Sequence, residues 1–309
     1  MQQAEKIVRT KPRVHGERRY RLWSFERPWP WLAPTIVLLL LYSVFPLVFN
    51  VYRSFFEFDP ISKAFKPVGW QNWITLSTDD RVFNALGVTL TLVVLALVIE
   101  FALGLLIALL FDREPWGVGV LQTLFILPMV VPPAIAAMIF RLLEHSDFGV
   151  ISWLLYSVGI ITPAEPLLGG TGRHALAGVL LVDIWQWTPF FALILLAGLK
   201  GLPHEPLEAA QVDGATALQR FWYIKLPLLA GVIAVAVLFR LIDLYKMFDY
   251  VFILTSGGPG NRTETLSYYA YLQSFSFIKW GYGATLGVFI TILVWVSAFA
   301  YTRIFKVRW

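Results

Sequence analysis

The sequence has no cysteine and few charged residues. Its 309 residues are 58% hydrophobic and only 15% charged. The absence of cysteine excludes a disulfide framework and a thiolate metal site. A soluble domain of this length could not cover so much apolar surface, so we expect lipid to surround the chain. We expect no metal site, because the four histidines are scattered without ligand spacing, at His15, His145, His174 and His204.

Two further absences narrow the function. The sequence has no phosphate-binding G-x-x-x-x-G-K-[ST] loop, so we expect any ATP that drives the protein to bind another chain. It also has no clustered nucleophile, base or paired metal ligands, which argues against a membrane-embedded enzyme. The net charge of +5 comes from basic segments beside apolar runs, so we expect no nucleic-acid binding.

Six apolar runs are each long enough to cross a bilayer, which takes about 20 residues. Their ends are approximate, and they lie at roughly 32–52, 84–111, 117–140, 174–198, 226–254 and 284–304. Pro34 and Pro46 interrupt the first run, but proline is tolerated in a transmembrane helix when neighbouring groups satisfy the freed carbonyls. The sequence therefore predicts an all-α membrane protein with six transmembrane helices.

Lysine and arginine residues predict the orientation of these helices. Residues 1–27 carry eight of them, and the C-terminus adds Arg303, Lys306 and Arg308. Because basic residues favour the cytoplasmic side, we expect both termini in the cytoplasm. This gives a basic N-terminal tail at 1–30 and a membrane domain at 31–309. Loops 112–116 and 199–225 then lie inside, and loops 53–83, 141–173 and 255–283 lie outside.

The loop between the fourth and fifth runs, at about 199–227, is long and patterned. Pro206 suits the first position of a short helix, and Gly214 suits the left-handed residue that ends one. A second short helix from Ala215 to Lys225 would follow. Two short helices separated by glycine form a compact knob, which we interpret as a docking surface for a partner.

Three motifs in this loop resemble the EAA motif of ATP-binding-cassette importer permeases. They are Glu208-Ala209-Ala210, Asp213-Gly214-Ala215 and Ile224-Lys225-Leu226-Pro227. The outer segments Leu254–Pro259 and Thr263–Tyr271 are similar to the first permease subunit of maltose-type carbohydrate importers. The resemblance covers about residues 30 to 309.

The resemblance implies a type I importer permease in a prokaryotic cytoplasmic (inner) membrane, with residues 31–309 as the permease domain. It implies partners as well: a second homologous permease, two ATPase subunits that bind Mg-ATP, and an extracytoplasmic substrate-binding protein received by loops 53–83 and 255–283. The chain itself would contact membrane lipid and a small carbohydrate or polyol and would hold no cofactor.

The resemblance also assigns the knob a role in coupling. The knob would sit in a cleft of an ATPase subunit, so that closure of the ATPase dimer moves the helices on either side. The residues that carry this role by resemblance are Glu208, Ala209, Ala210, Asp213, Gly214, Ala215, Leu226 and Pro227. The alternative is an interfacial helix that only anchors the loop.

Charged residues inside the fifth run are costly at membrane depth, and they therefore face a bundle interior, a partner or a water-filled path. Helical spacing places Arg240 and Asp243 on one face and turns Lys246 and Asp249 away from it. By resemblance, the residues that contact substrate are Asp183, Gln186, Trp187, Phe190, Arg240, Asp243, Leu244 and Met247. Maltose permeases hold mostly neutral groups there, which leaves room for a smaller, charged or polyol substrate.

Two alternatives remain open from the sequence. Arg240 and Asp243 either contact substrate or belong to a buried ion-pair network that fixes helix packing, with Glu100 as a structural hydrogen-bond partner. Core packing is an equal alternative for Trp187 and Phe190. At the level of the whole chain, the rival function is a secondary transporter or channel for small polar solutes that works alone.

Overall fold

The computed structural model describes residues 28–170 and 172–305. Only residues 28–30 of the expected basic tail are described. The basic residues from Lys6 to Arg27, and Lys306 and Arg308, lie outside the described residues. The chain divides into two units, 1–48 and 49–309, which are described separately. The described part is mostly helical, with one two-stranded hairpin.

The first unit contains most of the first apolar run. Helix α1 (Trp29–Leu39) continues through a π-helical turn (Leu40–Val44) into α2 (Phe45–Arg53), which extends into the second unit. Pro46 has no N–H to donate to the carbonyl of Tyr42, and the wider π turn lies directly before it. None of the residues in α1 and α2 is buried, as expected of a helix that faces lipid or another chain.

The second unit contains the hairpin and the remaining helices. The hairpin pairs β1 (Phe56–Asp59) with β2 (Ala64–Pro67) in antiparallel register. The α-helices follow in the order α3 (Gln71–Thr78), α4 (Asp80–Asp112), α5 (Val118–Val130), α6 (Pro133–Leu143), α7 (Val150–Ser157), α8 (Gly172–Lys200), α9 (His204–Val212), α10 (Ala217–Arg220), α11 (Leu226–Leu228), α12 (Ala230–Leu244), α13 (Leu266–Tyr271) and α14 (Trp280–Ile304). Further π turns lie at Phe221–Lys225, Val251–Thr255 and Leu272–Ser276.

The described helices include four that are long and apolar enough to cross a membrane, and six spans result if each of two bent pairs counts as one. The stretch expected to be one helix at 117–140 is α5 and α6, bent by 96°. Val131 is extended at the bend, because a residue that precedes proline, here Pro132, is kept out of the helical region.

The run expected at 226–254 also departs from a single helix. The segment Ala217–Leu228 meets α12 at an angle of 65°, and α12 ends at Leu244. Two of the carbonyls beyond that end accept hydrogen bonds from side chains of the α13 segment. Thr265 donates its hydroxyl to the Met247 carbonyl at 3.0 Å, and Ser267 donates to that of Tyr245 at 2.8 Å. Such satisfaction is what permits a non-helical backbone within a membrane domain.

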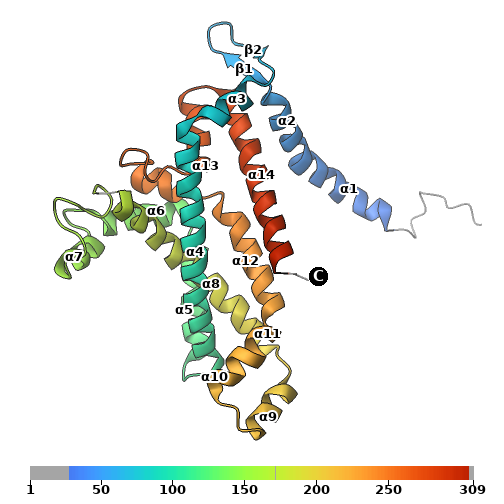
Figure 1. The fold of residues 1–309 in the computed structure, drawn as a ribbon, viewed down its shortest axis with the longest axis vertical. Helices are drawn as coiled ribbons and strands as arrows, with labels where there is room; N and C mark the ends of the chain where they lie inside the picture. The colour runs from blue at the N-terminus through green and yellow to red at the C-terminus, as the bar shows by residue number, and fades with distance from the viewer. Residues whose placement is uncertain (1–27, 171, 306–309) are drawn as a thin grey trace, which may run out of the picture. The chain divides into compact units, whose positions relative to one another are not determined.

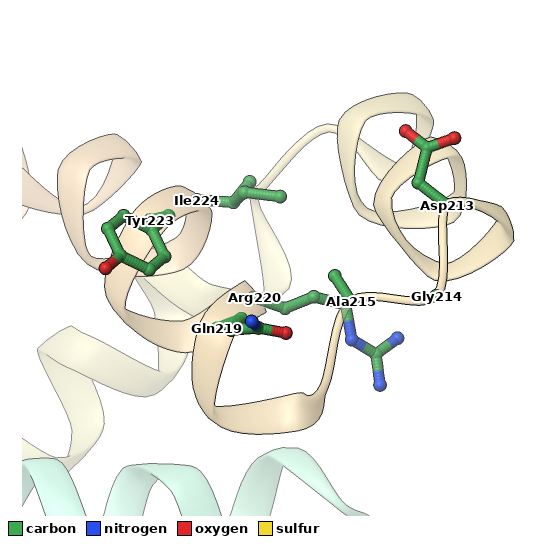
Figure 2. Close-up of a pocket in the computed structure, with 7 residues that line it drawn as sticks. All are labelled: Asp213, Gly214, Ala215, Gln219, Arg220, Tyr223 and Ile224. Atoms are coloured by element: carbon green, nitrogen blue, oxygen red, sulfur yellow. The ribbon is translucent and has the colours of Figure 1, made fainter.

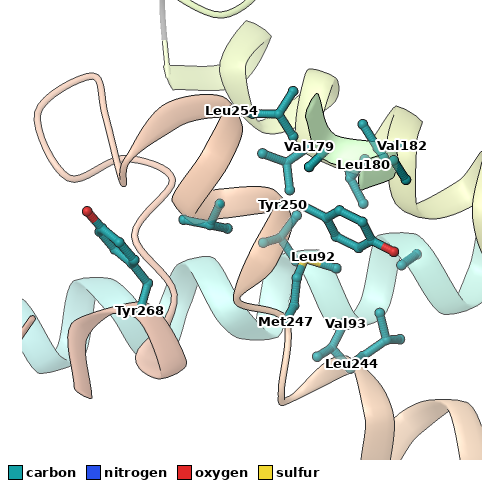
Figure 3. Packing of buried hydrophobic residues seen from close by; sticks show 14 of the residues in the cluster. Leu92, Val93, Val179, Leu180, Val182, Leu244, Met247, Tyr250, Leu254 and Tyr268 are labelled. Carbon is teal, nitrogen blue, oxygen red and sulfur yellow. The ribbon is translucent and has the colours of Figure 1, made fainter. Parts of the chain in front are cut away.

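Helices α4, α8 and α12 pack against one another and hold nearly half of the buried side chains among the described residues (Figure 1). The backbones of α4 and α8 approach each other closely at Gly104, where an added Cβ would lie 2.4 Å from the Cβ of Phe191. The largest apolar cluster joins these helices to the segment after α12. Figure 3 shows Tyr250 of that segment beside Leu92 of α4 and Val179 of α8.

The two ends of this bundle differ in character. Helices α9 and α10 lie at one end, which we call the knob end, and the β1–β2 hairpin and α3 lie at the other, which we call the hairpin end (Figure 1). At the hairpin end, Asp79 caps α4 and accepts hydrogen bonds from the hydroxyls of Tyr269 at 2.6 Å and Tyr282 at 2.7 Å. Although burial opposes it, these bonds lower the pKa of Asp79, so α4 begins at an ionised carboxylate.

Candidate functional site

The knob, residues 203–225, begins with a helix whose C-terminus is closed by glycine. Helix α9 ends at Val212, and Gly214 lies beyond it with φ +79°. The Gly214 N–H donates to the Gln211 carbonyl at 3.1 Å, and the Ala215 N–H donates to the Ala210 carbonyl at 2.9 Å. This pair of bonds is the Schellman arrangement, which requires a left-handed residue at the position of Gly214. The glycine expected from the sequence therefore sets the turn.

The second half of the knob is fixed by its own cap and by a tie to α9. Thr216 and Gln219 form a reciprocal capping box at the start of α10. The Arg220 guanidinium donates to the Gln211 side-chain oxygen at 2.9 Å, which joins α10 to α9. Lys225, at the end of the knob, pairs with Asp112 at the end of α4 at 2.8 Å.

Most of the predicted coupling residues lie on the surface of the knob. Glu208, Ala209, Asp213 and Gly214 are exposed, Ala210 and Ala215 are half-buried, and Leu226 and Pro227 follow the knob at the start of the next helix. Asp213, Gly214 and Ala215 line one side of a hollow of about 380 Å³, and Gln219, Arg220, Tyr223 and Ile224 line the other (Figure 2).

Large apolar side chains are exposed on the knob. Val212 is 88% exposed, and Leu218, Trp222 and Tyr223 are also mostly exposed. Apolar side chains gathered on a protruding surface and rimmed by polar groups mark an interaction site. The geometry of the knob therefore favours a docked partner over an isolated loop.

Four charged residues from three helices form an ionic cluster inside the bundle: Glu100, Asp183, Arg240 and Asp243. Arg240 of α12 binds both oxygens of Glu100 of α4 at 2.8 Å. It also donates to Asp183 of α8 at 2.6 Å and to Asp243, one turn further along α12, at 2.7 Å. Glu100, Asp183 and Arg240 are each at most 2% exposed, whereas Asp243 is 44% exposed. The cluster therefore opens outward on the side of Asp243.

A second hydrogen-bond chain lies beside the cluster. The Gln186 amide donates to the Val131 carbonyl, which the bend between α5 and α6 leaves free. The Tyr250 hydroxyl donates to the Gln186 oxygen at 2.7 Å, and the Trp187 indole N–H donates to Tyr250 at 3.3 Å. The Trp187 ring also lies 4.7 Å from the Arg240 guanidinium carbon. Both the nitrogen and the oxygen of the Gln186 amide are engaged in these hydrogen bonds, so Gln186 has a structural role here.

A cavity of about 100 Å³, which we call the α8–α12 cavity, lies against the cluster. Six of the eight residues predicted to contact substrate line it: Asp183, Trp187, Arg240, Asp243, Leu244 and Met247. Gln186 and Phe190 do not, and Phe190 packs edge-on against Trp187 and Phe191. Lys246 and Asp249, placed on another face by helical spacing, also line the cavity, because the helix ends at Leu244 and the chain turns there.

The sequence indicated one ion pair of the cluster and missed the others. Arg240 and Asp243 are three residues apart on one helix, so their pairing was expected and is confirmed. Glu100 was expected to be a structural hydrogen-bond partner, and it binds Arg240 as one. No sequence signal connects Glu100 or Asp183 to Arg240, because spacing within a helix says nothing of contacts between helices. Tyr250 and Pro133, which also line the cavity, were missed for the same reason.

The fold and the knob define a multi-pass membrane component of a transport system. Residues 100–308 match the family described as "Binding-protein-dependent transport system inner membrane component", and the chain belongs to this family. Members of this family are transport components of a membrane and not enzymes. The expected all-α type I importer permease fold is confirmed.

Two relatives and one solved structure illustrate the relationship. The chain is 37% identical over 305 residues to "Probable ABC transporter permease protein y4oQ" of Sinorhizobium fredii, with 97% of each chain covered. It is 31% identical to "Trehalose/maltose transport system permease protein MalF" of Thermococcus litoralis, covering 90% of this chain and 92% of the relative. It is similar in fold, with a TM-score of 0.75 and 23% identity, to a bacterial ABC transporter involved in the import of the acidic polysaccharide alginate, covering 91% of this chain and 96% of that one.

Proposed function

We propose that this chain is a permease subunit of an ATP-driven importer for a sugar or polyol. The observation that carries the proposal is the connection between two features: the exposed knob, followed by the short helix α11, links α8 to α12, and α8 and α12 hold Asp183 and Arg240 of the ionic cluster. The trehalose/maltose relative supports the carbohydrate class. A partner that moves the knob would thus move both walls of the α8–α12 cavity.

The knob is proposed to couple the chain to a separate ATPase subunit. Glu208 and Asp213 would meet polar or basic groups of that subunit, and the small side chains of Ala209, Ala210 and Ala215 would allow close approach. Since the sequence lacks a phosphate-binding loop, Mg-ATP would bind the ATPase partners, and this chain would hold no cofactor. The knob end would then face the cytoplasm, and the hairpin end would receive the substrate-binding protein.

The α8–α12 cavity is proposed to form one wall of the solute path. Its volume of about 100 Å³ is smaller than the 300–1,000 Å³ or so that is usual for ligand pockets. A second, homologous permease would therefore supply the opposite wall. Asp183, Arg240, Asp243 and Trp187 provide carboxylate, guanidinium and indole groups, which hydrogen-bond hydroxyls and stack on sugar faces.

The coupling role is tested with two knob variants in the complex with the ATPase subunits. Gly214→Asp would strain the left-handed turn, and Glu208→Lys would reverse an exposed charge. Both should lower solute uptake per ATP hydrolysed while the chain stays in the membrane. Asp147→Asn, an exposed residue of the α6–α7 loop, is the control. Unchanged uptake and ATPase stimulation in both knob variants would contradict the coupling role, and uptake by the purified chain alone would favour a secondary transporter.

A further inference from the structure

The guanidinium of Arg240 is the group in the α8–α12 cavity that would be expected to bind an anionic solute, but its donors are occupied. Guanidinium has five N–H groups. The Nε–H and one Nη2–H bind Glu100, the other Nη2–H binds Asp183, and one Nη1–H binds Asp243. Four of the five donors are thus used, so no pair of adjacent donors is left for bidentate binding of a carboxylate, sulfonate or phosphate. The Trp187 ring also lies over the guanidinium.

The formal charge around the cavity is negative. Glu100, Asp183 and Asp243 surround the single cation Arg240. Asp249 and Lys246 add one charge of each sign to the cavity lining, which gives four carboxylates to two cations. Lys246 is exposed, and its ammonium is a strongly hydrated point charge. An anion that enters the cavity therefore meets net repulsion, and it meets no fork of free donors in compensation.

The cavity instead offers free acceptors. The Oδ2 atom of Asp183 is buried and has no hydrogen-bond partner within the described residues, although the side chain lines the cavity and is only 1% exposed. An unsatisfied buried acceptor is costly, and a donor that reaches it removes the cost. Asp243, which is 44% exposed, presents its carboxylate on the same side. Hydroxyl groups are the donors that fit these two carboxylates without bringing a negative charge.

From these charges and hydrogen bonds we propose that the α8–α12 cavity takes a neutral polyhydroxylated solute and rejects anionic ones. Glu100 is then a specificity-determining residue, because it accepts hydrogen bonds from Arg240 donors that would otherwise bind an anion. This proposal rests on the proposed function. By this proposal, the chain differs in the charge of its solute from the structurally similar transporter that is involved in the import of an acidic polysaccharide. Glu100 acts through Arg240, so it is a positioning residue rather than a contact of the solute.

The absence of cysteine in the natural chain allows a direct test. Phe248 lines the cavity outside the ionic cluster, so the Phe248→Cys protein carries one reporter thiol. Its modification by a maleimide is measured in the purified complex with the second permease and the ATPase subunits, but without the binding protein, whose own selectivity would interfere. Matched solutes are compared: trehalose with trehalose 6-phosphate, glucose with glucuronate, and glycerol with glycerol 3-phosphate. The neutral member should protect the thiol at concentrations at least about tenfold lower than the anionic member.

Two further variants test the role of charge. In the Phe248→Cys protein, Glu100→Gln removes a negative charge beside Arg240, and Asp243→Asn removes one from the half-exposed part of the cluster. Each substitution should lower the ratio of protecting concentrations, anionic member to neutral member, by several-fold. Asp243→Asn is the safer variant for folding, and Asp147→Asn, remote and exposed, should leave the ratio unchanged. If the anionic members protect the Phe248→Cys thiol as well as the neutral members or better, the proposed preference for neutral solutes is wrong, but the solute site itself stands. Protection by no solute of any pair would overturn the solute site itself and, with it, this part of the proposed function.

Discussion

Replacing Arg240 by methionine should strongly destabilise the protein, and the structure explains why. The side chain is 2% exposed and makes ion pairs with Glu100, Asp183 and Asp243 at 2.6–2.8 Å. Methionine matches much of its length but leaves three carboxylates without a cation, of which Glu100 and Asp183 are buried. Removing one member of a buried ion pair costs about 3–5 kcal/mol, because the remaining charge is uncompensated.

The assay is thermal unfolding of the purified protein in detergent. A loss of this size should lower the Tm by on the order of 10 °C. Arg262→Met is the matched control, because Arg262 is exposed at the hairpin end, and it should change stability by less than about 0.5 kcal/mol.

A triple variant separates charge from packing. Substituting Arg240→Met, Glu100→Met and Asp183→Leu together removes the buried charges and retains apolar volume, and it should recover most of the stability lost in Arg240→Met. The reasoning would be refuted if Arg240→Met has the same Tm as the unsubstituted protein, or if the triple variant has a lower Tm than Arg240→Met. The first result would mean that water or another group compensates the carboxylates.

Three further predictions concern other parts of the molecule. Lys225→Asp should lower the amount of solute transported per ATP hydrolysed by a few-fold, since the partly exposed ion pair with Asp112 is worth about 0.5–1 kcal/mol. The charge-swapped double variant, Lys225→Asp with Asp112→Lys, should restore this amount; if it does not, the ion pair has no role in coupling. Burial raises the pKa of Glu144, which follows α6, to about 8, so its contribution to stability is complete below its ordinary pKa near 4.5 and is lost as the pH rises towards 8. Melting curves of Glu144→Gln should lack this decline between about pH 4.5 and 8, and an unchanged profile would exclude Glu144 as its source. A single cysteine at Ile61, 95% exposed in the hairpin, should react with an impermeant maleimide while the cytoplasmic membrane is intact, whereas one at Trp116, 99% exposed near the knob end, should react only after that membrane is opened. Labelling of both across an intact membrane would contradict the proposed orientation.

The sequence predicted those features that depend on local chemistry. Long apolar runs identify membrane helices because hydrocarbon demands about 20 apolar residues. Gly214 was identified as the end of a helix because few residues other than glycine adopt the left-handed conformation without strain, and its φ of +79° agrees. The pairing of Arg240 with Asp243 followed from helical spacing alone. In each case the cause lies within a few residues of the effect.

Two features of the fold were missed, one with a local sequence signal and one that depends on contacts between distant segments. Pro132 and Pro133 signal the bend that divides 117–140, so this bend could have been read from the sequence. The end of α12 at Leu244 could not, because it has no proline or glycine and depends on hydroxyls of Thr265 and Ser267 that reach the freed carbonyls. The turn that follows is what brings Lys246 and Asp249 to the cavity.

Helix α4 gives the ionic cluster a second connection to the knob, beyond the direct one through α8 and α12. Asp112 at one end of α4 binds Lys225 of the knob, and Glu100, twelve residues earlier on the same continuous helix, binds Arg240. At 1.5 Å per residue these two positions are about 18 Å apart along a single rigid element. Movement of the knob would therefore act on Arg240 from both α12 and α4, which holds the guanidinium against its carboxylates while the helices shift. On this argument the Lys225→Asp variant should impair coupling without changing the preference for neutral over anionic solutes, whereas Glu100→Gln should change both.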